Sequence, residues 1–160
     1  MKPLLVRSAE VADVGEIVRI YVESWNQGFG DLMPPIAPDR ERLDRWAAEI
    51  AQPPPHRWWV AVSGVEIVGF VGICPSRDPV DPQLGELDTI AVDPRSWRRA
   101  VGARLMATAL EQLRRDGYRS ALLWTLDRYP RGSAFYASTG WRLNGATREA
   151  GSQIRYDHDL

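Results

Sequence analysis

Residues 85–106 decide the fold of this chain, and they read GELDTIAVDPRSWRRAVGARLM. The stretch from Leu84 to Val92 is rich in apolar and β-branched residues, which predicts a buried strand. Pro94 ends that strand, and a short basic loop follows. A helix is predicted from Val101 to Arg115, because its apolar residues share one face and Gly117 lies just beyond its end.

This helix leads into a second apolar run, Ala121 to Leu126. A strand, a helix and a strand in succession favour a parallel pair joined by a crossover. The patterns on either side of this unit predict antiparallel neighbours. Those further elements are a strand at Leu4–Val6, a helix from about Val11 to the glycines near Gly30, a helix at Asp39–Ala51, strands at Arg57–Val62 and Val65–Cys74, a short helix at Ser133–Ser138, and a hairpin from Trp141 to about Tyr156.

The fold class expected from this order is α/β, of the α+β type. We expect a mixed, mostly antiparallel sheet of six to seven strands, flanked by about four helices. The sequence shows no linker or internal repeat, so residues 1–160 are predicted to form one domain.

The composition limits the classes of function that we expect for this protein. The chain has 20 basic and 21 acidic residues, so its net charge of −1 argues against a nucleic-acid or membrane-surface binder. It has no apolar run of the roughly 20 residues that a membrane helix needs, and a cytoplasmic location is expected. Cys74 is the only cysteine and there are two histidines, so we expect neither a disulfide nor a metal site.

The start of the Val101 helix has the features of an anion site. Backbone N–H groups are free there, and the helix dipole is positive. Arg98 and Arg99 add charge beside it, so a diphosphate would be held well. The alternative is a plain strand–loop–helix unit with solvated arginines.

The loop resembles a known motif. Residues 97–102, WRRAVG, are similar to the coenzyme A motif of the GCN5-related N-acetyltransferases (GNAT), Arg/Gln-x-x-Gly-x-Gly/Ala after a strand that ends in Val-x-Pro. Gly102 matches, whereas Trp97 and Ala100 depart from the pattern. Alanine is tolerated at residue 100 if its φ stays below zero.

The resemblance extends over essentially the whole chain. It includes Leu123–Asp127, the Phe135–Tyr136 pair followed by Gly140–Trp141, and a closing strand at Gln153–Tyr156. Tyr129 stands where many members have an asparagine that contacts the cofactor.

The resemblance implies a splayed parallel strand pair with acetyl-CoA bound between the strands as co-substrate, and no metal. It implies the following cofactor-binding residues: Ile90, Ala91, Val92, Trp97, Arg98, Arg99, Ala100, Val101, Gly102, Ala103 and Tyr129.

The resemblance also implies a direct transfer that needs a base and an acid. Glu86 matches the position of a known family base, and Asp88 lies two residues further along the same strand. Glu86, Asp88 or a water relay would take the proton of the amine, unless both carboxylates are simply solvated or bonded to a neighbouring strand. Tyr136 matches the position of the family's usual acid, and the alternative role is that of an aromatic residue in the core.

The acceptor is expected to be a primary amine of a small molecule or a peptide. Trp25 and Phe29, with Asp88, are the candidate acceptor-side residues, although Trp25 reads equally well as core. A homodimer is compatible with the family. The competing function is a non-catalytic acyl-CoA-binding sensor or subunit domain, which the departures at Trp97, Ala100 and Tyr129 leave open.

Overall fold

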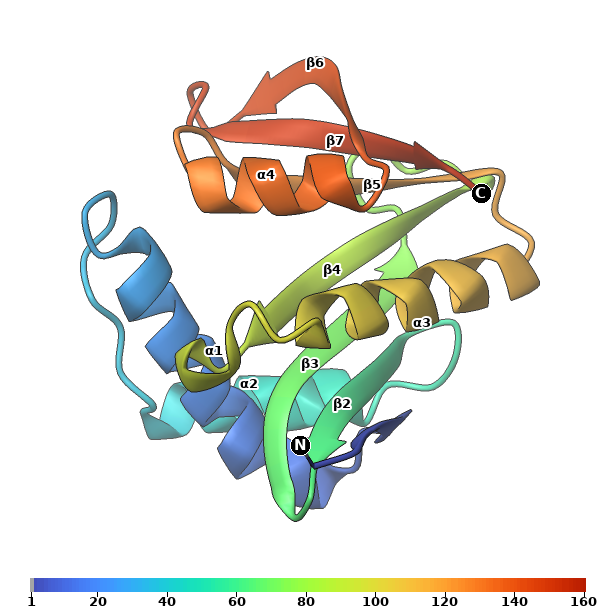
Figure 1. Cartoon of the computed structure of the whole chain (residues 1–160). Helices are drawn as coiled ribbons and strands as arrows, with labels where there is room; N and C mark the ends of the chain where they lie inside the picture. Colours follow the sequence, from blue (N-terminus) through green and yellow to red (C-terminus); the bar gives the residue numbers. More distant parts are fainter. Residues whose placement is uncertain (1) are drawn as a thin grey trace.

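The computed structural model describes residues 2–160 and contains the main elements in the predicted order (Figure 1). These elements are β1 (Leu4–Ser8), α1 (Val14–Phe29), α2 (Arg40–Ile50), β2 (Arg57–Ser63), β3 (Glu66–Pro75), β4 (Leu84–Val92), α3 (Val101–Arg115), β5 (Ser120–Leu126), α4 (Pro130–Ser138), β6 (Arg142–Arg148) and β7 (Gln153–Asp159). Two short 3₁₀ turns, Val11–Asp13 and Pro94–Ser96, precede α1 and α3. The predicted short helix begins earlier than expected, at Pro130, because proline suits the first position of a helix.

The strands form one seven-stranded sheet in the order β1-β2-β3-β4-β5-β7-β6. Among the described strands only β4 and β5 run parallel, and the other neighbours are antiparallel. Within residues 2–160 this confirms the predicted mixed, mostly antiparallel sheet with about four helices.

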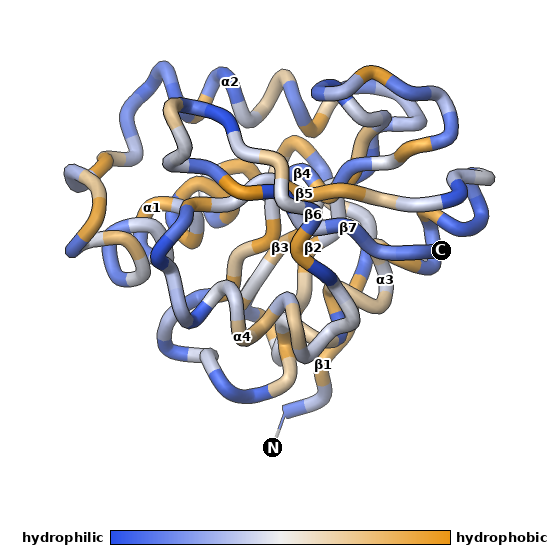
Figure 2. The backbone as a smooth tube through the Cα atoms, turned by 90° about the horizontal axis from the view of Figure 1, so that it is seen from above, coloured by the Kyte–Doolittle hydropathy of each residue, from blue (hydrophilic) through white to orange (hydrophobic). Residues whose placement is uncertain are grey.

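Helices cover both faces of the sheet. In Figure 1, α3 and α4 lie on the near face, and α1 and α2 lie behind it. Leu105 and Leu113 of α3 are fully buried in one apolar cluster, whereas Ile17 of α1 and Trp46 of α2 belong to a second cluster. The backbone is mostly hydrophobic along the central strands and mostly hydrophilic in the outer loops (Figure 2). The two clusters hold the sheet rigidly from both sides.

None of the helices in the described part of the chain is long and apolar enough to span a bilayer.

Candidate active site

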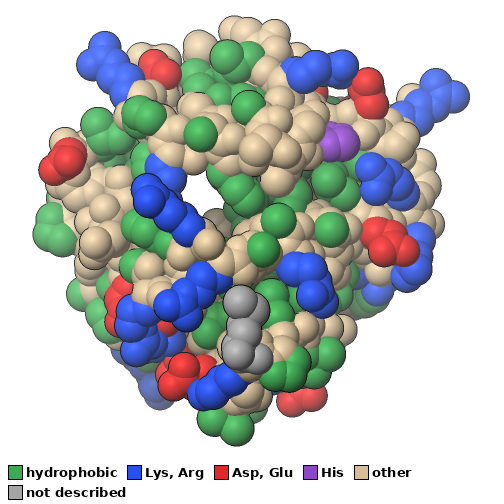
Figure 3. All heavy atoms as spheres, viewed as in Figure 1, with side chains coloured by type: hydrophobic (Ala, Val, Ile, Leu, Met, Phe, Trp, Pro, Cys, Tyr) green, Lys and Arg blue, Asp and Glu red, His purple; other side chains and the backbone are tan. Residues whose placement is uncertain are grey.

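The sheet divides between β4 and β5. These strands pair only at Leu84–Glu86 with Ser120–Leu122. Beyond that point, β4 stays paired with β3 and β5 stays paired with β7. A cavity of about 640 Å³ lies in the gap, lined by β4, the start of α3, and α4. Figure 3 shows the surface hollowed in this region, with basic side chains beside the hollow. The splayed parallel pair is therefore present.

The loop between β4 and α3 has an unusual backbone. Arg98 and Ala100 have φ values of 62° and 63°, in the left-handed region that favours glycine. The condition under which alanine is tolerated at residue 100, a φ below zero, is therefore not met. The chain must reverse direction there to enter α3, and the packed elements on either side enforce the turn. Turns of this kind direct successive N–H groups into one concavity, which suits an anion.

The first turn of α3 completes this concavity. The first helical hydrogen bond runs from the Arg104 N–H to the Ala100 carbonyl, at 3.1 Å. The N–H groups of residues 101–103 precede that bond, so they have no partner within the helix. Residues 100–103 all line the cavity. Free amides, the positive end of the α3 dipole and Arg98 together fit a diphosphate.

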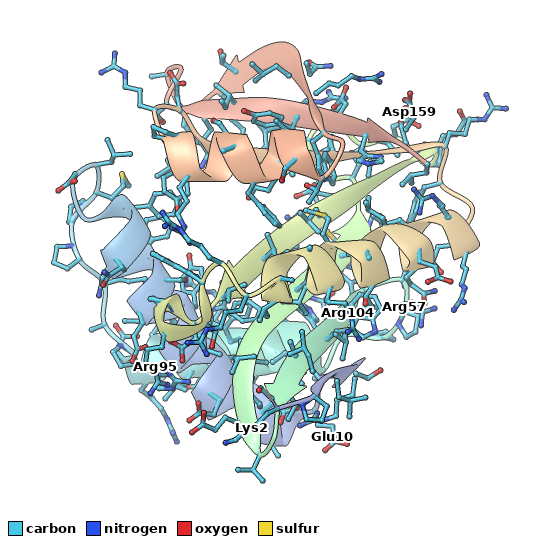
Figure 4. The ribbon with its side chains drawn as sticks, viewed as in Figure 1. Lys2, Glu10, Arg57, Arg95, Arg104 and Asp159 are labelled. Carbon is cyan, nitrogen blue, oxygen red and sulfur yellow. The ribbon has the colours of Figure 1, made fainter. Side chains whose placement is uncertain are left out.

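Asp93 anchors this loop from behind. Its carboxylate is 1% exposed and accepts hydrogen bonds from the Arg95 backbone N–H at 3.0 Å and the Arg95 guanidinium at 2.7 Å. It also accepts one from Arg19 of α1 at 3.2 Å. Arg95 is labelled in Figure 4, where it lies beside α1. These bonds, led by the one from the Arg95 side chain, lower the pKa of Asp93 to about 2. Asp93 therefore ties the loop to α1.

Most of the predicted cofactor residues meet at the cavity. Arg99 is the exception, since its side chain is exposed and does not line the cavity. The predicted residues that line it are Ile90, Ala91, Val92, Trp97, Arg98, Ala100, Val101, Gly102, Ala103, Tyr129, Tyr136 and Phe29. Residues that are more than 40 positions apart in the sequence therefore line one cavity.

Helix α4 forms the opposite wall. A Cβ added at Gly102 would lie 3.0 Å from the Phe135 ring, so the glycine lets α4 approach the start of α3 closely. Tyr136 lines the cavity, and its ring packs 5.5 Å from that of Tyr156. Burial raises the pKa of Tyr136 to about 12. Its hydroxyl therefore remains protonated at neutral pH and can donate a hydrogen bond.

The two candidate carboxylates lie at an irregularity in β4. Gly72 is opposite Thr89 and Ile73 is opposite Leu87, so Asp88 has no partner residue on β3. A bulge of this kind changes the direction of the side chains around it. Neither Glu86 nor Asp88 lines the cavity. Asp88 lies two residues before Ile90, which does, a distance of about 7 Å along a strand.

An arginine that sequence reasoning missed joins these carboxylates. The backbone N–H of Arg77 donates to Glu86 Oε1 at 3.1 Å, and its guanidinium bonds Oε2. The same guanidinium lies 3.3 Å from Asp88. The hydroxyl of Thr89 also donates to Asp88, at 2.9 Å. Glu86 is 4% exposed, with both oxygens engaged, and burial is the main cause that raises the pKa of Asp88.

Aromatic side chains close one side of the cavity. Phe29, at the end of α1, lies 4.4 Å from the Tyr129 ring, measured between ring centroids. Trp25 packs behind Phe29 at 4.8 Å and does not line the cavity. The end of α1 thus meets the start of α4, as Figure 1 shows.

The cavity has further lining residues that were not predicted. They are Ser24, Ser96, Thr125, Arg131, Gly132, Ala134, Phe135, Ser138 and Thr139. Arg131 is the charged one among them. A basic residue in the first turn of the helix that follows the second parallel strand was the available signal.

Comparison with known proteins identifies a matching family and several relatives. The sequence model of the acetyltransferase (GNAT) family matches residues 15–141. An uncharacterized N-acetyltransferase from Archaeoglobus fulgidus is 29% identical over 139 residues, which are 86% of this chain and 92% of the relative. YuaI, an uncharacterized N-acetyltransferase from Bacillus subtilis, is 25% identical over 132 residues, 78% of this chain and 73% of the relative.

A solved structure has the same fold. The PaiA N-acetyltransferase from Thermoplasma acidophilum, in complex with coenzyme A, matches with a TM-score of 0.80 at 15% identity and covers 99% of both chains. The family match spans most of the chain. This protein therefore belongs to the acetyltransferase (GNAT) family and is an acetyl-CoA-dependent N-acetyltransferase.

Proposed function

We propose that this protein transfers an acetyl group from acetyl-CoA directly to a primary amine of a small molecule or a peptide. One observation carries the proposal: a single cavity joins the anion-binding start of α3 to the free edge of β4 and to Tyr136. An elongated ligand with a phosphate-bearing end and a reactive thioester end fits this arrangement.

The chain's own residues would hold the cofactor at both ends. The amides of residues 101–103 and the side chain of Arg98 would bind the diphosphate. Past Glu86, the edge of β4 that faces the cavity has no strand partner, so its backbone groups are available to the extended pantetheine arm. The Val92 carbonyl is already used, because the Trp97 indole N–H donates to it at 2.8 Å.

In the proposed reaction the amine nitrogen bonds to the acetyl carbon, and the bond between that carbon and sulfur breaks. Holding the two reactants together supplies much of the rate. The nitrogen gives up a proton to a base, and the departing sulfur takes one from the Tyr136 hydroxyl.

Geometry favours Asp88 over Glu86 as the base. Both carboxylates contact Arg77, Glu86 through a backbone and a guanidinium bond and Asp88 at 3.3 Å, so the choice between them depends on position and burial. Asp88 is nearer to the cavity along β4, and burial raises its pKa toward the range that suits a base. The other ionisable groups near it are Arg77, Glu86 and His56.

Thiol release with a panel of amines tests the transfer. We expect turnover with at least one amine, and saturable binding of coenzyme A without any amine. Binding without turnover across the panel would favour the non-catalytic acyl-CoA sensor. Absence of coenzyme binding would reject both functions.

The pH dependence of kcat/KM tests the base. We expect Asp88→Asn to lower kcat by about 100-fold or more and to remove the acid limb of the profile, whereas Glu86→Gln should keep that limb. Glu111→Gln, an exposed change on α3, is the control. Loss of the limb in Glu86→Gln alone would identify Glu86 as the base, and an unchanged limb in both variants would point to water.

A further inference from the structure

Two residues from opposite walls of the cavity touch each other. The guanidinium carbon of Arg131 lies 3.5 Å from the ring centroid of Trp97. Trp97 belongs to the loop after β4, and Arg131 lies in the first turn of α4, after β5. Both side chains line the cavity. The contact therefore crosses the gap between the diverging strands.

The Trp97 ring is held in place as a platform. Its indole N–H donates to the Val92 carbonyl at 2.8 Å, which fixes the ring beside the end of β4. A guanidinium prefers to stack on such a ring face, so the platform orients Arg131. Trp97 itself carries no charge, and the positive charge above its ring belongs to Arg131 of α4.

The charge of Arg131 is available to a ligand. Among residues 2–160, Arg131 takes part in none of the ion pairs, whereas Arg19 and Arg95 are both paired with Asp93. The start of α3, whose residues 101–103 have amides that precede the first helical hydrogen bond, lines the same cavity. A guanidinium is planar and has several donors, which suits phosphate oxygens.

We propose that Arg131 binds the diphosphate of coenzyme A, presented by the Trp97 ring, so that α3 and α4 hold the ligand from both sides. This inference rests on the proposed function for its ligand. Arg131 is a binding residue and takes no part in moving the proton or the acetyl group.

Calorimetric titration of the full chain with coenzyme A tests the assignment. Arg131→Gln should weaken binding by roughly 10- to 50-fold, the effect of losing a charge-assisted hydrogen bond. The salt dependence of binding should also become flatter, because one screened attraction is gone. Arg131→Lys keeps the charge without the planar donors and should recover part of the affinity.

The matched control is Arg114→Gln, which removes an exposed arginine in the last turn of α3 that does not line the cavity. It should bind coenzyme A as the unchanged protein does. Trp97→Ala removes the platform, and we expect it to lose part of the affinity while Arg131 remains. Melting temperatures confirm that each variant is folded.

Two shorter ligands locate the contact. Dephospho-coenzyme A keeps the diphosphate, so the loss in Arg131→Gln should be as large as with coenzyme A. Pantetheine has no phosphate, so its binding should be unchanged by the substitution. A loss that disappears with dephospho-coenzyme A would assign Arg131 to the ribose phosphate instead, and an equal loss with pantetheine would show a structural effect.

Failure of this inference is distinguishable from failure of the proposed function. If the unchanged protein binds coenzyme A and Arg131→Gln binds it equally well, only the role of Arg131 is rejected. If the unchanged protein binds no coenzyme A at all, the proposed function and this inference are both rejected.

Discussion

Replacing Ala100 with glycine should stabilise the protein, although glycine within a helix usually weakens it. Ala100 has a φ of 63° and caps α3 without any side-chain hydrogen bond. A left-handed conformation costs an ordinary L-residue about 1–2 kcal/mol, and glycine adopts it without that cost. The greater freedom of glycine in the unfolded chain costs about 0.4–1 kcal/mol. The net expectation is a gain of about 0.5 kcal/mol in the free energy of unfolding.

The matched control is Ala107→Gly. Ala107 is exposed in the middle of α3, where glycine costs about 1 kcal/mol relative to alanine. The two variants should therefore differ by about 1.5 kcal/mol, or about 3–6 °C in melting temperature for a chain of this size. Both variants lose one methyl group, so the size of the deletion does not separate them.

Urea unfolding followed by tryptophan fluorescence measures the difference. If Ala100→Gly loses as much stability as Ala107→Gly, the loop does not rest in the left-handed conformation, and the shape assigned to the anion site is wrong. Coenzyme A titration of the same variants adds a second readout. Ala100→Gly should bind at least as tightly as the unchanged protein, because the missing methyl group leaves more room for a phosphate.

Three further changes have defined outcomes. The pKa of Asp93 is lowered to about 2 from an ordinary 3.8, so its stabilisation is present above pH 3.8 and is lost as the pH falls through 2. Asp93→Asn should cost about 2 kcal/mol in urea unfolding at pH 7, with a smaller difference from the unchanged protein at pH 3. Tyr136→Phe should lower kcat about 100-fold with little change in coenzyme A affinity, and an equal loss of both would argue against an acid role. In Gly72→Ala the new Cβ would lie 2.3 Å from the Trp58 ring, so the free energy of unfolding should fall by about 1–3 kcal/mol in urea unfolding; an unchanged free energy would contradict the tight packing.

Local patterns were sufficient to predict the order of the elements. Strand and helix periodicity depends on residues that are two to four positions apart, and these spacings are visible in the chain itself. The segment 84–126 was predicted as a strand, helix and strand with a parallel pair, and the sheet confirms it. The boundaries were less accurate, as at α4, where Pro130 extends the helix by three residues.

Such local patterns could not predict the contacts between distant segments of the chain. Arg131 meets Trp97, and Arg19 reaches Asp93 across 74 positions of the chain. Arg77 joins Glu86 and Asp88 only because the loop between β3 and β4 folds back over the strand. No spacing rule links these residues, since each pair is brought together by the packing of whole elements.

The backbone conformation of Ala100 shows most clearly the difference between local sequence effects and tertiary packing. By itself, the sequence determined that a strand, a basic loop and a helix succeed one another here, because the propensities and the proline act locally. It did not determine the sign of φ at residue 100, since alanine prefers negative values when isolated. Only the tertiary structure decided that sign, because β4 and α3 are each packed against the core and the short loop must join them.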